Sequence, residues 1–69
     1  MNDAKLKLTI LKHPAVETLE FENENGWWAH LRPGWIDGES MTHSILEDDL
    51  ADVLAKLKFV RRKTLGDPV

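Results

Sequence analysis

The chain has 69 residues, of which 42% are hydrophobic and 30% charged, with no cysteine and a formal net charge of −3. Such a chain makes one small domain without disulfides, and its composition is typical of a folded protein rather than a disordered one. No apolar run approaches the roughly 20 residues of a membrane helix, and the N-terminus lacks the basic-then-apolar order of a signal peptide. We therefore expect a single cytoplasmic domain over residues 1–69, with no membrane contact and with the last few residues flexible.

The first predicted element is a strand over residues 5–10, where polar and apolar residues alternate. This period of two is typical of a half-buried strand, and the residues expected to face the core are Leu6, Leu8 and Ile10. After Pro14, a second strand is predicted over residues 16–22, with Leu19 and Phe21 on one face. Its other face should be solvated, because it carries Thr18, Glu20 and Glu22.

The clearest turn in the chain is Asn25-Gly26. These two residue types readily take the positive φ angles of a type I′ hairpin turn. The pair precedes a third predicted strand, Trp27 to Leu31, so we expect an antiparallel hairpin with residues 16–22.

Adjacent strand residues point to opposite faces, so Trp27 and Trp28 cannot both face the core. We place Trp27 inside, because Ala29 and Leu31 share its face. Trp28 is then expected outside. A slip of one residue in the register would reverse this assignment.

Two turns and one short strand are predicted before the C-terminal third of the chain. Pro33-Gly34 fits the central positions of a type II turn, and Asp37-Gly38 indicates a further turn. Residues 41–45 alternate between polar and apolar side chains and predict a short fourth strand.

A C-terminal helix has the strongest pattern in the chain. Ser44 and Glu47 match a capping box for its start, and basic residues gather toward its end. One apolar stripe with helical spacing is formed by Leu46, Leu50, Val53, Leu54, Leu57 and Val60. The expected fold class is α+β: an antiparallel sheet of three to four strands with one C-terminal amphipathic helix packed on one face.

Three tryptophans within nine positions point to a binding surface: Trp27, Trp28 and Trp35. All three could instead be structural, because large aromatic side chains bury much area in a small domain. Tryptophan and arginine are nonetheless enriched at interface hot spots. The candidate binding residues are Trp28, His30, Arg32 and Trp35, flanked by Glu20 and Glu22.

No catalytic or cofactor signature accompanies this surface. The three histidines lack metal-ligand spacing and have no cysteine to join them, so we predict neither a metal site nor a cofactor. His43 and Ser44 lack a nucleophile elbow, so we expect no enzyme activity. Single-stranded nucleic acid is not an expected partner, because acidic side chains flank the aromatic strand where a basic groove would be needed.

The run Gly26-Trp27-Trp28, continued by Pro33-Gly34-Trp35 and His43-Ser44-Ile45, resembles small single-domain accessory proteins of bacteriophages and prophages. This resemblance covers about half the chain and rests on a Trp-rich hairpin that leads into a short amphipathic helix. It implies a non-enzymatic protein that binds a host or phage protein, in some cases as an inhibitor.

Two other functions fit the same residues. A structural homodimer could close through the Trp-rich strand, because small domains without disulfides gain stability from self-association. The acidic side chains could instead mimic nucleic acid and compete for a basic groove on another protein.

Overall fold

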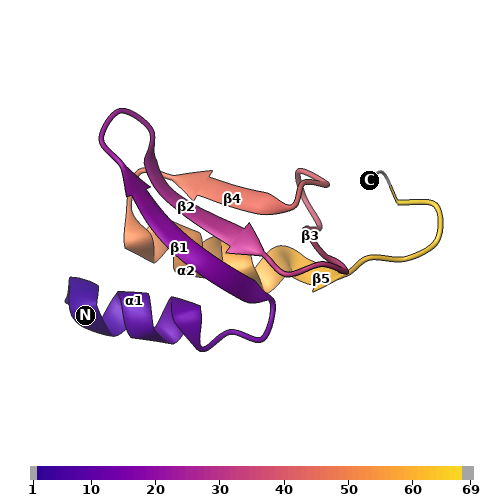
Figure 1. The fold of residues 1–69 in the computed structure, drawn as a ribbon, viewed down its shortest axis with the longest axis horizontal. Coiled ribbons are helices and arrows are strands. Elements are labelled where there is room, and N and C mark those ends of the chain that lie inside the picture. Colours follow the sequence, from indigo (N-terminus) through magenta and orange to yellow (C-terminus); the bar gives the residue numbers. More distant parts are fainter. Residues whose placement is uncertain (1, 68–69) are drawn as a thin grey trace.

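The computed structural model describes residues 2–67, which fold into an α+β domain (Figure 1). Its helices and strands follow in the order α1 (Asp3–Leu11), β1 (Val16–Glu22), β2 (Gly26–Leu31), β3 (Trp35–Asp37), β4 (Ser44–Glu47), α2 (Leu50–Lys56), the 3₁₀ helix η1 (Leu57–Phe59) and β5 (Val60–Arg62). The α+β class and an antiparallel sheet of three strands are therefore confirmed. The expected flexible end of the chain lies in part outside the described residues.

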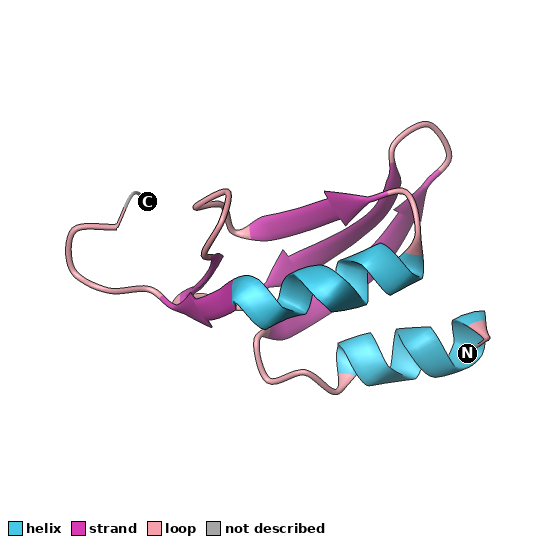
Figure 2. Cartoon of the chain, turned by 180° about the vertical axis from the view of Figure 1, so that it is seen from behind, coloured by secondary structure: helices cyan, strands magenta, loops and turns pink. Residues whose placement is uncertain are grey.

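Two sheets, two α-helices and the short 3₁₀ helix η1 make up the described part of the domain. The larger sheet has the strand order β1-β2-β4 and is antiparallel throughout, and β3 pairs with β5 in a separate antiparallel sheet. Figure 2 shows both helices on the same side of the three-stranded sheet. The core lies between them, where α1 contributes Leu6 and Ile10, α2 contributes Leu50 and Val53, and the sheet contributes Ala29, Leu31 and Ile45.

The prediction of a strand over residues 5–10 is wrong, because this segment is helix α1. The Asn2 side chain accepts a hydrogen bond from the Lys5 N–H at 2.9 Å and so caps the helix N-terminus. Leu6 and Ile10, four residues apart, lie on one helix face and are buried, whereas Leu8 is 57% exposed. A single helix at the C-terminal end is thus replaced by two helices that pack against each other.

The predicted hairpin is confirmed, but its turn is of another kind. Strands β1 and β2 pair through Glu22–Gly26 to Thr18–His30, with an irregularity near Val16. Asn25 does not take a positive φ, and its N–H donates to the Glu22 carbonyl at 3.1 Å. Of these two turn residues, only Gly26 has a left-handed conformation, with φ of 101°. A type I′ turn needs a positive φ at both, so the type I′ assignment is wrong.

The turn at Pro33-Gly34 has the predicted form. The Trp35 N–H donates to the Arg32 carbonyl at 3.1 Å, and Gly34 has φ of 89°, as a type II turn requires. The strand that follows, β3, places Ile36 in a fully buried position.

The predicted C-terminal helix begins too early and ends too late. Residues Ser44–Glu47 form strand β4 instead of a capping box, and α2 begins at Leu50 after Asp49, whose side chain makes no capping hydrogen bond. Pairing of β4 with β2 buries Ile45, which a helix start at this position would not do. The predicted strand over residues 41–45 is therefore right in existence but shifted toward the C-terminus.

Beyond β5, the chain is held by Asp67. Its carboxylate accepts hydrogen bonds from the Arg61 guanidinium at 2.9 and 3.0 Å and from the Thr64 N–H at 2.6 Å. The Arg61 hydrogen bonds, followed by that of Thr64, hold the pKa of Asp67 well below its usual range.

A pH titration should detect the hydrogen bonds that the Asp67 carboxylate accepts from Arg61 and Thr64. A carboxylate whose pKa is lowered in the folded state contributes stability above its unfolded pKa of about 3.9, and this contribution is lost as pH falls through the folded value. We expect the Asp67 carboxyl carbon, followed by NMR, to titrate well below pH 3.9 in the native protein and Asp67→Asn to loosen the Thr64 amide. A titration midpoint of Asp67 at the ordinary carboxyl pKa would contradict these hydrogen bonds.

Candidate functional site

The three-stranded sheet has one face that carries no helix among the described residues (Figures 1 and 2). Residues paired directly across the strands share a face, and Trp28 is opposite both Glu20 and Leu46. We call this surface the open face, and its residues are Thr18, Glu20, Glu22, Trp28, His30, Ser44 and Leu46.

The two adjacent tryptophans are divided between the faces as predicted. Trp27 packs against the buried core on the helix side, where its ring also lies 4.9 Å from that of Phe21. Trp28 lies on the open face and is half-buried. The neighbours of Trp28 along β2 and β4 that point the other way, Ala29 and Ile45, are 0% and 2% exposed.

The Trp28 ring is fixed by contacts from two sides. Its Nε1–H donates to Glu22 Oε2 at 2.6 Å, and the other oxygen of Glu22 accepts from the Asn25 amide at 2.7 Å. The ring stacks on His30, with centroids 5.9 Å apart and planes 7° apart. Because these contacts restrain the side chain before any partner arrives, the ring loses less conformational entropy when it is covered.

Acidic side chains surround this aromatic pair. His30 Nε2 lies 3.8 Å from Glu20 Oε1. Successive contacts therefore connect Glu22 to Trp28, Trp28 to His30, and His30 to Glu20. No lysine or arginine belongs to the open face. The face therefore offers an aromatic surface with negative charge on one flank, which suits a cationic partner.

The structure brings together four of the six predicted binding residues: Glu20, Glu22, Trp28 and His30. Trp35 lies in the other sheet and packs against the core. The Arg62 guanidinium lies 4.6 Å from the centroid of its ring, and the His13 ring is T-shaped to it with centroids 6.5 Å apart. Arg32 is exposed in the loop after β2, where its N–H donates to the Ala15 carbonyl.

Sequence reasoning missed Ser44 and Leu46 as members of the open face. It placed Ser44 both in the predicted strand 41–45 and in a capping box, and it assigned Leu46 to the helical stripe. Leu46 is 38% exposed and is opposite Trp28, so it extends the open face toward β4.

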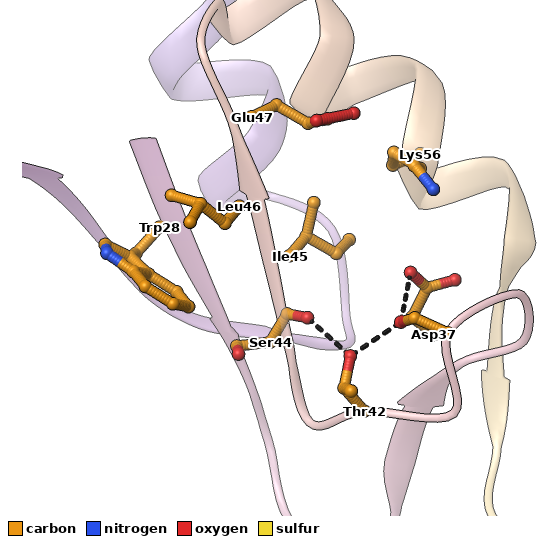
Figure 3. Close-up of a pocket in the computed structure, with 9 residues that line it drawn as sticks. Trp28, Asp37, Thr42, Ser44, Ile45, Leu46, Glu47 and Lys56 are labelled. Atoms are coloured by element: carbon orange, nitrogen blue, oxygen red, sulfur yellow. Dashed lines mark hydrogen bonds between the residues drawn. The ribbon is translucent and has the colours of Figure 1, made fainter. Parts of the chain in front are cut away.

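A cavity of about 390 Å³ lies beside β4, between Trp28 and Lys56 (Figure 3). It is lined by Trp28, Asp37, Ser40, Thr42, Ser44, Ile45, Leu46, Glu47 and Lys56. Buried Asp37 accepts the Glu39 N–H and the Ser40 hydroxyl, each at 2.9 Å. Lys56 Nζ lies 2.9 Å from Glu39 Oε1, and this hydrogen bond raises the pKa of Lys56.

These polar groups satisfy one another, which indicates a structural role for the loop between β3 and β4. The three histidines lie apart: His13 Nδ1 accepts the Ala15 N–H, His43 Nδ1 lies 3.3 Å from the Trp35 carbonyl, and His30 is on the open face. Within residues 2–67, no group of three or more His, Cys, Asp or Glu side chains could hold a metal ion. None of the helices in that range is long and apolar enough to cross a membrane.

Comparison of the chain with protein-family models, with curated proteins and with solved structures gave no match. The site consists of an aromatic pair, Trp28 and His30, beside the carboxylates of Glu20 and Glu22, on the sheet face that the helices leave open.

Proposed function

We propose that this chain is a non-enzymatic protein-binding module that uses the open face, with Trp28 at the centre of the contact. The observation that carries the proposal is the held position of Trp28, which is bonded to Glu22 and stacked on His30 outside the core. A rigid, partly exposed tryptophan is the type of side chain that dominates interface energetics.

The partner should present basic side chains to this face. Glu20 and Glu22 stand on one side of the aromatic pair, and a lysine or arginine over the Trp28 ring would gain both a cation–π contact and ion pairing. The same carboxylates would repel nucleic-acid phosphates, so a protein is the favoured partner. The resemblance to phage accessory proteins stays a prediction, and so do the host or phage origin of that partner, an inhibitory effect and a cytoplasmic location.

Trp28→Ala tests this proposal. We expect at least a tenfold loss of affinity for a captured partner, equal to about 1.4 kcal/mol, as measured by calorimetry or surface plasmon resonance. Leu8→Ala is the matched control, because Leu8 is an exposed apolar residue on α1, away from the open face. Equal affinities of Trp28→Ala and the native protein, with both folded by circular dichroism, would refute the proposal.

A second copy of the chain is the alternative occupant of the open face. A two-fold contact with its axis across the strands would bring Glu20 and Glu22 of one copy near the same residues of the other, and this like-charge contact disfavours such a dimer. Light scattering across a concentration series decides between the two. A dimer that Trp28→Ala dissociates would assign the open face to self-association.

A further inference from the structure

Strand β4 leaves one side of its backbone without a partner strand. The Leu31 N–H donates to the His43 carbonyl at 2.9 Å, and β2 and β4 continue in this register with Ala29 opposite Ile45 and Trp27 opposite Glu47. Hydrogen-bonded and non-hydrogen-bonded pairs alternate in an antiparallel ladder. The N–H and C=O groups of Ser44 and Leu46 therefore point away from β2, to the outer edge of the sheet.

One of these outward groups is already satisfied within the domain. The Thr42 hydroxyl donates to the Ser44 carbonyl at 2.9 Å. No hydrogen bond within residues 2–67 is seen for the Ser44 N–H, the Leu46 N–H or the Leu46 carbonyl. Such a row of unpaired backbone groups is a template for an added strand.

The cavity described above lies at this edge. Figure 3 shows β4 running between Trp28 on one side and Asp37 with Lys56 on the other. The groups that line it differ between the two sides of β4, since Trp28 and Leu46 belong to the open face and Glu47 to the opposite face. The edge is thus recessed between the loop after β3 and the end of α2.

We propose that the outer edge of β4 pairs with an extended basic segment of another protein, which adds a fourth strand to the sheet. This inference rests on the proposed function and names how the partner reaches the open face. Alternate side chains of such a strand point to opposite faces. Its apolar residues would lie against Leu46 at the border of the open face, and its lysines or arginines would lie beside Glu47 on the other face.

The charges that line the cavity beside β4, here called the groove, favour a basic occupant. Lys56 is paired with Glu39, and the charges of Asp37 and Glu47 also act on it, so three carboxylates share one ammonium group. Glu47 is half-buried and makes no ion pair with the described residues. A cationic side chain at this position would gain a partner without displacing one.

The shape of the groove favours a single strand over a second copy of this chain. A second β4 has the same loop, residues 37–42, and the same Lys56 side chain beside its edge, so two copies would bring both sets of groups to one contact, whereas a single extended strand brings none. The edge of β1 is a weaker candidate, because α1 runs along that strand (Figure 1).

The probe is an acetylated and amidated pentapeptide of alternating lysine and valine. At millimolar concentration it should slow amide exchange at Ser44 and Leu46 at least tenfold, as measured by NMR. Ile45 and Glu47 provide an internal control, because their amides already bond to β2 and should change little. The same peptide with all its peptide nitrogens methylated should have no effect, and a glutamate–valine version should bind at least tenfold more weakly.

Leu46→Pro removes an outward N–H and leaves the bonds between β4 and β2 in place, as proline does on an edge strand. Leu46→Pro should weaken binding of the lysine–valine peptide at least tenfold. Leu46→Ala keeps the N–H, so its loss of affinity for the peptide should be less than half of the loss caused by Leu46→Pro. If Leu46→Pro does not fold, the methylated peptide on the native protein decides the question. Unchanged exchange at Ser44 and Leu46, or equal effects of the plain and methylated peptides, would overturn the inference.

The outcomes also separate this inference from the proposed function. If Trp28→Ala weakens partner binding while the peptide leaves the β4 amides unchanged, the open face binds its partner without strand addition. If the peptide pairs with β4 but Trp28→Ala has no effect on the partner, the edge is the contact and the Trp28-centred proposal fails.

Discussion

Replacing Ile10 by alanine should lower the free energy of unfolding by about 2–5 kcal/mol, as is typical of fully buried aliphatic side chains. Ile10 is 0% exposed and lies where α1 meets the core. A domain of this size has a total stability of roughly 3–10 kcal/mol, so this loss is large enough to unfold much of the protein. Urea denaturation followed by tryptophan fluorescence measures it.

Leu8→Ala is the control for this prediction. Leu8 is 57% exposed on the other side of α1, so its truncation should change the free energy of unfolding by no more than about 0.5 kcal/mol. In a strand over residues 5–10, both side chains would face the core and both truncations would be costly. Similar losses for Ile10→Ala and Leu8→Ala would therefore contradict helix α1.

The error at α1 shows why alternation in a short segment is ambiguous. Leu6, Leu8 and Ile10 fit a strand with period two, but Leu6 and Ile10 also fit one face of a helix. What selects the helix is the packing of α1 against α2 together with the Asn2 cap. The first of these is a contact between distant parts of the chain, and local pattern does not contain it.

The same competition decides the other end of the chain. Leu46 continues the helical stripe of α2, but pairing with β2 places it in a strand opposite Trp28. The candidate site was therefore predictable where it depends on the hairpin, as for Trp28, His30, Glu20 and Glu22. It was not predictable where it depends on β4 or on the separate sheet that holds Trp35.

Gly26→Ala should lower the free energy of unfolding by roughly 3 kcal/mol, because two penalties coincide at this residue. Its φ of 101° is strained for any residue with a Cβ. A Cβ there would also lie 2.5 Å from the Glu47 carbonyl oxygen and 3.0 Å from the Asp48 Cα, both of which are backbone atoms. Relief of the clash would require β2 and β4 to move apart.

Gly34→Ala isolates the backbone penalty. Gly34 has a similar φ of 89°, but the nearest atom to an added Cβ is the end of the Arg62 side chain at 3.9 Å. We expect this variant to lose about 1–2 kcal/mol, the cost of a left-handed conformation alone. Chemical denaturation of both variants under one set of conditions gives the comparison.

The consequence of Gly26→Ala should extend to binding. On one side of Gly26 is the Glu22 side chain, which accepts hydrogen bonds from the Trp28 indole and from Asn25. On its other side is the end of β4 at Glu47. Displacing Gly26 should weaken the Trp28–Glu22 hydrogen bond and shift the Trp28 indole N–H resonance, whereas Gly34→Ala should leave that resonance in place. Equal losses of stability in the two variants, with an unshifted indole signal, would mean that the close approach of Gly26 to Glu47 does not position the open face.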